Sequence, residues 1–188
     1  MDNRLQSNSA LFLMQPNDFD DRVGVHSTLY LLRRDASLCF GYNPNNGQKI
    51  QYEALFPATM AVLAGIDLIA KFVYRDRGNV GDRFRGYVKK YIENNFHEEL
   101  YQLRNSLLHS FGLYSEGGNK KIYRFVLKRG IRTLIEQDSS GYYFVDVELL
   151  WKKFETSIST YNEELIASVD LQQIFSEMFP KYGLIGVQ

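Results

Sequence analysis

The chain is poor in cysteine and carries no excess charge. Cys39 is the single cysteine, and 22 basic residues balance 22 acidic ones among 188. One cysteine cannot form an internal disulfide or a cysteine-built zinc site, and the scarcity of cysteine fits a reducing compartment. A formal net charge of zero gives no overall field that draws in nucleic acid or a membrane. We therefore expect a cytoplasmic protein, without a metal or other cofactor, in which any basic surface is local.

Long hydrophobic runs are also missing. The N-terminal segment has no apolar stretch behind a basic start, as a signal peptide would. The most apolar segment, residues 58–73, is interrupted by Asp67 and Lys71 and is shorter than a bilayer span. Hydrophobic residues make up 45% of the chain, an ordinary value for a soluble globular protein. The sequence predicts a single domain over residues 1–188 and no membrane partner.

Several catalytic signatures are absent as well. The sequence contains no G-x-S-x-G elbow, no H-E-x-x-H and no dinucleotide-binding fingerprint. No pair of carboxylates has the spacing of metal ligands, which disfavours a metal-dependent nucleotide hydrolase. Cys39 has no histidine or basic neighbour in sequence to activate its thiol. The lone His26 falls on the apolar face of an expected helix, which is more typical of a core or interface histidine than of a ligand.

Hydrophobic spacing predicts a mainly α protein. Helices are expected over residues 18–34, 57–75, 82–95, 98–111, 147–166 and 171–178. Asn17 and Asp18 are candidate N-caps of the first helix, and Asp82 of the third. Residues 115–121 read as a loop, and residues 122–127, 132–137 and 142–147 as strands of a small antiparallel β element.

The stretch from Glu98 to Ser110 holds the most informative side chains. Leucines at three- and four-residue steps give it one apolar stripe. Asn105 and His109 lie four residues apart, and Arg104 precedes Asn105, so the three project into one region. Arginine matches phosphate oxygens with a planar fork of donors, and histidine exchanges protons near neutral pH. The alternative is that His109 only complements the negative end of the helix dipole.

Asp67 lies inside the apolar helix expected over residues 57–75. A buried carboxylate requires a partner, because an unpaired buried charge is unfavourable. Asp67 could orient Arg104 or His109, or it could face solvent. A second charged feature follows the expected loop, where basic residues alternate with Tyr123 and Phe125 and no acidic residue intervenes. These candidate RNA-binding residues are Lys120, Lys121, Arg124, Lys128, Arg129 and Arg132; alternatively, their charges protect an edge strand.

The six residues from Arg104 to His109 resemble the R-polar-x-x-x-H motif of the HEPN superfamily, the higher-eukaryote and prokaryote nucleotide-binding domains. The preceding segments are also similar: an apolar helix with the step Gly65-Ile66-Asp67, then a helix with the pattern F-x-x-Y-V-x-K-Y at residues 84–91. The resemblance covers about residues 18–114 as four core helices. Residues 115–188 would then form an extension with strands and helices.

The resemblance implies an up-and-down four-helix bundle that often forms a homodimer, with two copies of the motif facing each other. Many members are metal-independent endoribonucleases of toxin–antitoxin or phage-defence systems. Carried over to this chain, Arg104 would neutralise the scissile phosphate, His109 would act as acid or base at the ribose 2′-hydroxyl, and Asn105 would position one of them. Other members are non-catalytic modules that bind a nucleotide, an RNA or a protein partner such as an antitoxin, and this alternative stays open.

Overall fold

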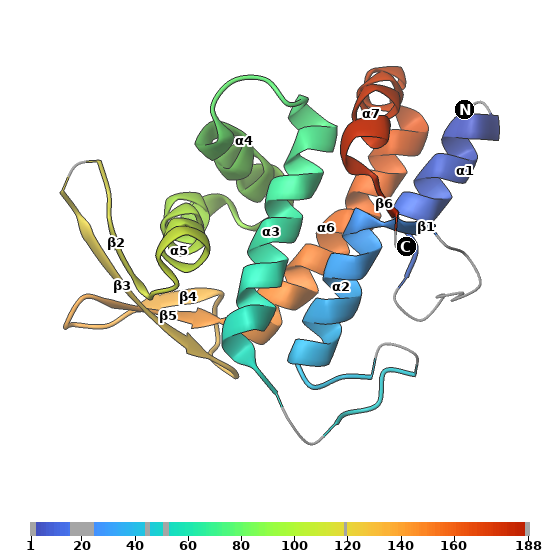
Figure 1. The fold of residues 1–188 in the computed structure, drawn as a ribbon. Helices are drawn as coiled ribbons and strands as arrows, with labels where there is room; N and C mark the ends of the chain where they lie inside the picture. The colour runs from blue at the N-terminus through green and yellow to red at the C-terminus, as the bar shows by residue number, and fades with distance from the viewer. Residues whose placement is uncertain (1–2, 16–24, 44–45, 51–52, 119, 187–188) are drawn as a thin grey trace.

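The computed structural model describes residues 3–15, 25–43, 46–50, 53–118 and 120–186 (Figure 1). Its helices are α1 (Asn3–Phe12), α2 (Thr28–Cys39), α3 (Leu55–Tyr74), α4 (Val80–Tyr87), α5 (His97–Ser110), α6 (Val147–Ala167) and α7 (Val169–Tyr182). Helix α4 continues as the π-helix η2 (Val88–Ile92), which the 3₁₀ turn η3 (Asn94–Phe96) follows. The strands are β1 (Val25–Ser27), β2 (Tyr114–Glu116), β3 (Ile122–Lys128), β4 (Ile135–Gln137), β5 (Tyr142–Asp146) and β6 (Leu184–Gly186).

Helix α3 is the central helix, and it contacts α2, α4, α5, α6 and α7. Its sequence is apolar on nearly every side, as a helix surrounded by others requires. At Gly65 the helix approaches α6 closely, since an added Cβ would lie 2.6 Å from Cζ of Phe154. Among the described residues, α3 is long and apolar enough to cross a membrane, which corrects the expectation that this segment is too short. Most of it is buried inside the protein, as in a core helix.

The ends of the chain contribute to the same core. Phe12 of α1 packs against Phe72 of α3, with ring centroids 4.2 Å apart, and Phe72 packs against Phe175 of α7 at 5.4 Å. The N-terminal residues therefore include a packed helix. Helices α6 and α7, which were expected as part of an extension, enclose α3 together with α2 (Figure 1). The fold is mainly helical, as predicted, but more helices surround α3 than a four-helix bundle of residues 18–114 would supply.

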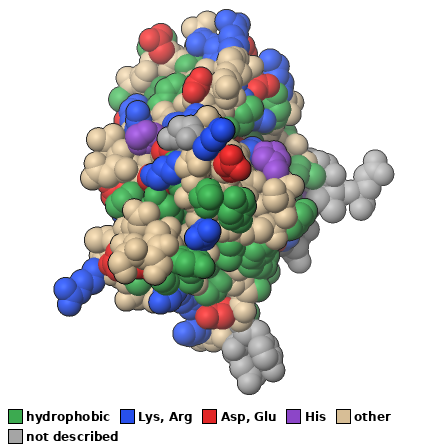
Figure 2. All heavy atoms as spheres, turned by 90° about the vertical axis from the view of Figure 1, so that its left-hand side faces the viewer, with side chains coloured by type: hydrophobic (Ala, Val, Ile, Leu, Met, Phe, Trp, Pro, Cys, Tyr) green, Lys and Arg blue, Asp and Glu red, His purple; other side chains and the backbone are tan. Residues whose placement is uncertain are grey.

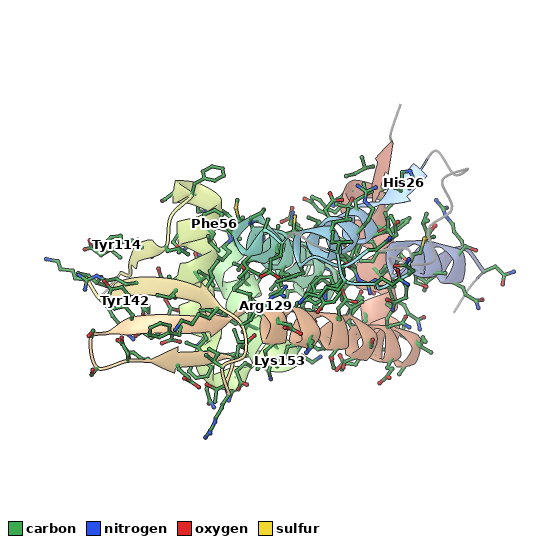
Figure 3. The ribbon with its side chains drawn as sticks, turned by 90° about the horizontal axis from the view of Figure 1, so that it is seen from below. His26, Phe56, Tyr114, Arg129, Tyr142 and Lys153 are labelled. Carbon is green, nitrogen blue, oxygen red and sulfur yellow. The ribbon has the colours of Figure 1, made fainter. Side chains whose placement is uncertain are left out.

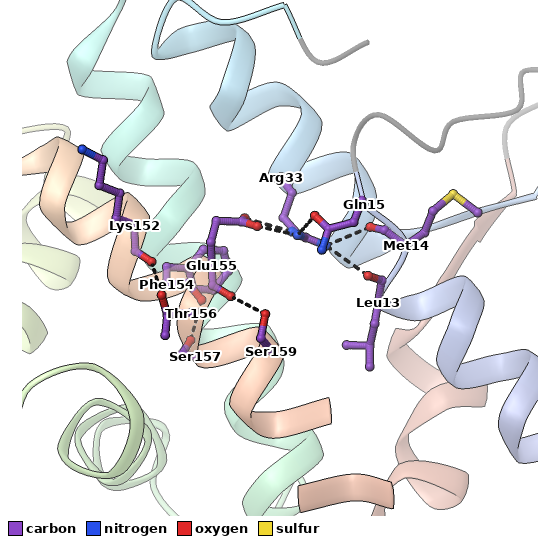
Figure 4. Close-up of polar contacts among 10 residues, drawn as sticks. All are labelled: Leu13, Met14, Gln15, Arg33, Lys152, Phe154, Glu155, Thr156, Ser157 and Ser159. Atoms are coloured by element: carbon purple, nitrogen blue, oxygen red, sulfur yellow. Dashed lines mark hydrogen bonds and ion pairs between the residues drawn. The ribbon is translucent and has the colours of Figure 1, made fainter. Parts of the chain in front are cut away.

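A buried arginine joins α2 to the segment after α1 and to α6. The Arg33 side chain is completely buried and forms a two-pronged ion pair with Glu155. Its remaining donors bind the carbonyl oxygens of Leu13 and Met14 and the side chain of Gln15 (Figure 4). A buried guanidinium is tolerated because each of its N–H groups has an acceptor.

The larger sheet has the strand order β2-β3-β5-β4 and lies at one end of the helices (Figure 1). The β2–β3 and β4–β5 pairs are antiparallel, as predicted for this element, whereas the central β3–β5 pair is parallel. Side chains along β3 alternate between buried and exposed positions, so Tyr123 and Phe125 face the core. Tyr143 of β5 stacks on Tyr123 at 5.5 Å, which extends the aromatic inner face.

Two helix starts differ from the sequence-based prediction. Residues 25–27, expected to be helical, form β1, which pairs with β6 from the other end of the chain. Ser27 then caps α2 by accepting a hydrogen bond from the backbone N–H of Tyr30. Asn79, and not Asp82, caps α4, because its side-chain oxygen lies 2.7 Å from the backbone nitrogen of Gly81. The expected caps Asn17 and Asp18 lie outside the described residues.

The strand predictions were accurate for β3 and β5 and less so elsewhere. The expected loop over residues 115–121 overlaps β2, whose three residues pair with β3. The expected strand over residues 132–137 shortens to β4, residues 135–137. Both differences concern three-residue strands, which gain their hydrogen bonds from a neighbouring strand and carry little pattern of their own.

Candidate functional site

Helix α5 positions the three motif residues because its leucines fix its rotation. Leu100, Leu103 and Leu107 are fully buried against the core. This orientation leaves Arg104 and Asn105 half-buried and His109 exposed. The helix ends immediately afterwards at Phe111, which has a left-handed backbone with φ of +48° and a side chain that is 73% exposed. Such a conformation costs roughly 1 kcal/mol or more in a non-glycine residue.

The motif residues form one hydrogen-bonded chain with Asp67 of α3. The Arg104 guanidinium donates from Nε to the Asp67 carboxylate at 2.7 Å, and its Nη2 lies 2.6 Å from the same oxygen. Its Nη1 donates to Oδ1 of Asn105 at 3.1 Å and lies 2.6 Å from Nε2 of His109. Because the guanidinium can only donate, we infer that Nε2 of His109 is the acceptor and carries no proton in this arrangement.

The sequence left open whether Asp67 orients Arg104 or His109 or faces solvent, and in the structure it binds Arg104. The carboxylate pairs with Arg104, and both side chains are largely buried, with exposed fractions of 17% for Asp67 and 13% for Arg104. Burial raises the pKa of the Asp67 carboxyl above its ordinary value, while the charge and hydrogen bond of Arg104 act in the opposite direction. The ion pair holds Nε and Nη2 of the guanidinium against Asp67. The remaining nitrogen, Nη1, is therefore directed at the His109 imidazole.

A cleft of about 700 Å³ runs along the polar side of α5. His109 and Asn105 line one part of it, and Glu98 and Gln102 line another. Strand β2 supplies the facing residues, including Ser115, whose hydroxyl donates to Gln102 at 2.6 Å. Sequence reasoning missed this wall, because it assigned residues 115–121 to a loop. The cleft is within the size range of small-ligand sites in proteins.

The cleft residues around Glu98 form a second polar network. Arg85 of α4 donates to Glu98 at 2.6 Å and stacks over the Tyr101 ring at 3.9 Å. Burial alone would raise the pKa of Glu98, but hydrogen bonds from Gln102 and Arg85 outweigh this effect and hold the pKa below its ordinary value. Glu98 therefore remains an anion at neutral pH and is bound to protein donors.

A smaller cavity of about 220 Å³ borders Arg104 between α3, α4 and α5. Its other lining residues are Asp67, Lys71, Asp76, Val80 and Arg83. Sequence reasoning did not assign Lys71 or Arg83 to a site. A signal was present for Lys71, which follows Asp67 by four residues and therefore lies on the same side of α3.

Two of the six candidate RNA-binding cations have structural partners. Lys121 lies 3.6 Å from the Glu99 carboxylate on α5. Arg129 pairs with Glu53 at 2.6 Å and donates to the carbonyl oxygen of Phe40, so it ties the end of the sheet to the segment between α2 and α3. In Figure 3, Arg129 lies where the sheet meets the helices.

The other four candidate cations are exposed, and none of them lines the cleft beside His109. Arg124 and Lys128 alternate with the buried residues of β3, so they lie on the outer face of the sheet, over the rings of Tyr142 and Phe144. Lys120 and Arg132 are exposed in the flanking turns. Figure 2 shows basic and acidic side chains interspersed on the face that carries the sheet, without one continuous basic patch.

The remaining histidine and cysteine candidates lie elsewhere. His26 is half-buried in β1 and stacks beside Tyr30 at 6.4 Å. It lies at the opposite end of the molecule from Tyr114 and Tyr142 (Figure 3). Burial raises the pKa of the Cys39 thiol. Within the described part of the chain, no three histidine, cysteine or acidic side chains gather closely enough to bind a metal ion.

No model of a known protein family, no curated protein and no solved structure matches this chain.

Proposed function

We propose that the protein is a metal-independent endoribonuclease of the HEPN type, with Arg104, Asn105 and His109 as its catalytic residues. One observation carries the proposal. A permanent cation, Arg104, contacts the imidazole of His109 at 2.6 Å, and His109 borders a cleft. Phosphodiester cleavage needs a group that accepts a proton and a cation that stabilises the developing negative charge, and these two side chains provide both.

The chemistry starts when a phosphate of the RNA replaces His109 as the acceptor of Nη1. Nε2 of His109 is then free to take the proton of the ribose 2′-hydroxyl. The 2′-oxygen bonds to phosphorus and the bond to the 5′-oxygen breaks, so the products carry a 2′,3′-cyclic phosphate and a 5′-hydroxyl. A protonated imidazole returns the proton to the departing oxygen. Asp67 holds the guanidinium in place, and Asn105 orients Arg104 through its side-chain oxygen.

We propose a homodimer as the active form. The support is Phe111, an aromatic residue that is 73% exposed at the end of α5, two positions after His109. Exposed aromatic side chains are enriched at protein interfaces. A two-fold axis near Phe111 would bring the His109 residues of two chains together, one as base and one as acid. A toxin or phage-defence role under the control of an antitoxin protein, with RNA as the substrate, would follow from the resemblance.

A non-catalytic binding module is the second candidate. It is favoured by the fact that Arg104 already donates to Asp67, Asn105 and His109, as an arginine in a purely structural network would. Such a protein would bind a nucleotide, an RNA or a protein along the cleft and leave RNA intact.

The test is an RNA-cleavage assay in EDTA with wild type, Arg104→Ala, His109→Ala and the control His97→Ala. His97 lies on the same helix, where it contacts the carbonyl oxygen of Asn94. We expect the cleavage rate to fall roughly 10²–10⁴-fold in the His109 and Arg104 variants and to stay at the wild-type value in the His97 variant. Light scattering should show that all four proteins are folded and dimeric. Equal rates in the four proteins would favour the binding module.

A further inference from the structure

The cavity of about 220 Å³ beside Arg104 contains more basic than acidic groups. Lys71, Arg83 and Arg104 line it together with Asp67 and Asp76, which gives a formal charge of +1. Helices α3, α4 and α5 each contribute one cation. The three cations belong to different helices, and the packing of these helices keeps them apart around the cavity.

Both acidic groups already have basic partners. Asp67 pairs with Arg104 at 2.6 Å. Asp76 pairs with Arg83 at 3.2 Å and accepts a hydrogen bond from the hydroxyl of Tyr182. That hydrogen bond lowers the pKa of Asp76 more than any other contact, and the charges of Lys71 and Arg83 lower it further. Each carboxylate therefore already has a basic partner, Asp67 in a largely buried pair and Asp76 at the protein surface.

Lys71 is the cation that remains. Its ammonium lies 3.9 Å from the centroid of the Tyr182 ring. The side chain is half-buried and forms no direct ion pair among the residues that the structure describes, while its charge acts at longer range to lower the pKa of both Asp67 and Asp76. An ammonium without a direct ion pair, in a cavity whose two carboxylates are each bound to an arginine, attracts an anion from solution.

We propose that this cavity is a phosphate-binding subsite in which Lys71 and Arg104 contact the phosphate oxygens and Arg83 adds positive charge. Phosphate fits better than a carboxylate because its oxygens point in several directions and can meet cations from two helices at once. Arg83 acts through its charge, since it already donates to the carbonyl oxygens of Arg77 and Gly78 and to Asp76.

The subsite goes beyond the proposed function, because it would bind phosphate whether or not His109 cleaves RNA. The two sites share Arg104, whose Nη1 contacts His109 and whose Nη2 is on the Asp67 side that borders the cavity. If RNA is the substrate, a phosphate neighbouring the scissile one would occupy the cavity and fix the strand relative to His109.

The experiment is a titration of the full chain with inorganic phosphate at low ionic strength, followed by backbone amide NMR shifts of residues 67–83. Wild type is compared with Lys71→Met, which keeps the aliphatic stem, and with Lys89→Met, the same change at an exposed lysine. We expect saturable shifts in wild type and in the Lys89 variant, and affinity about tenfold weaker in the Lys71 variant, as for one lost charge-assisted contact. Equal affinity in all three proteins, or no saturable shift in wild type, would overturn the proposal.

A second arm identifies the source of the phosphate. A thymidine dinucleotide, which lacks the 2′-hydroxyl and cannot be cleaved by its attack, is titrated into the same proteins. If Lys71→Met also weakens binding of the dinucleotide, the subsite accepts a phosphate within a strand. If the substitution weakens binding of inorganic phosphate only, the subsite accepts a free or terminal phosphate. Both results support a phosphate site. Phosphate binding at Lys71 in a protein that leaves RNA intact would retain this inference and reject the ribonuclease proposal.

Discussion

Two arginines of this molecule each bind a carboxylate from a helix far away in sequence, yet their surroundings differ. Arg33 of α2 binds Glu155 of α6, and its side chain has no exposed area. Arg104 of α5 binds Asp67 of α3, and 13% of its side chain is exposed. The donors of Arg33 bind Glu155, two carbonyl oxygens and an amide (Figure 4). One donor of Arg104 binds an exposed histidine beside a cleft.

The difference separates a structural arginine from one that can exchange partners. The carbonyl partners of Arg33 belong to the backbone that directly follows α1, and the guanidinium that they bind has no exposed area, so no solute can replace them at its donors. His109 is exposed and can rotate away, which would release Nη1 of Arg104 for a phosphate oxygen. The same type of ion pair thus joins buried elements of the fold in one place and holds a guanidinium beside an exposed histidine in the other.

The largest effect on stability is expected from Arg33→Met. The change leaves Glu155 without its partner and the carbonyl groups of Leu13 and Met14 without their donor. Removal of one partner from a buried pair costs about 3 kcal/mol or more, which lowers the melting temperature by roughly 10 °C in a domain of this size. Urea and thermal unfolding measure it.

The matched control is the double variant Arg33→Met with Glu155→Leu. Replacing both charges by apolar groups restores much of the loss, because no uncompensated charge remains. A loss below about 1 kcal/mol in the single variant would contradict the comparison, since Arg33 would then contribute no more to stability than a surface ion pair.

A smaller effect on stability is expected from Asp67→Asn, within about 1 kcal/mol at pH 7, because the amide oxygen still accepts from Arg104. The rate of RNA cleavage should fall by about tenfold, as for loss of a group that orients a reactive residue. A stability loss as large as that of Arg33→Met would remove the distinction between the two pairs.

The pH dependence of this variant has a definite sign. Burial raises the pKa of Asp67 in the folded state, so the folded protein binds this proton more tightly than the unfolded chain. The contribution of the carboxyl to wild-type stability is full below its unfolded pKa and is lost as the pH rises through the folded pKa. The Asn variant should therefore gain stability relative to wild type across that interval. Urea unfolding of both proteins from pH 3.5 upward measures this difference in stability. A loss of stability in the Asn variant relative to wild type as the pH rises would contradict the predicted sign.

The sequence predicted the features that depend on the residue pattern within a single helix or strand. The leucine stripe fixed the rotation of α5, so the common direction of Arg104, Asn105 and His109, away from the leucines, followed from spacing alone. The mainly helical fold and the strands β3 and β5 also followed from hydrophobic patterns. The catalytic roles of these residues stay predictions, as does the resemblance on which they partly rest.

Features that depend on packing between distant segments could not be predicted. Arg33 carries no sequence signal of burial, since its partner Glu155 lies 122 residues away. Strand β2 forms a wall of the cleft because it pairs with β3 and packs against α5. Lys71 and Arg83 approach Arg104 because α3, α4 and α5 pack together. Arg129 was grouped with RNA-binding cations by sequence, but it is bound to Glu53 across the fold.

The most direct test of the account uses an RNA that carries one 2′-deoxy nucleotide at a bond that the wild-type protein cuts. We predict that this bond stays intact while unmodified bonds are cut to 2′,3′-cyclic phosphate ends, because Nε2 of His109 acts on the 2′-hydroxyl of the nucleotide before the break. Cleavage of the modified bond at the unmodified rate would contradict the account, since the Arg104–His109 pair would then have no internal nucleophile to activate.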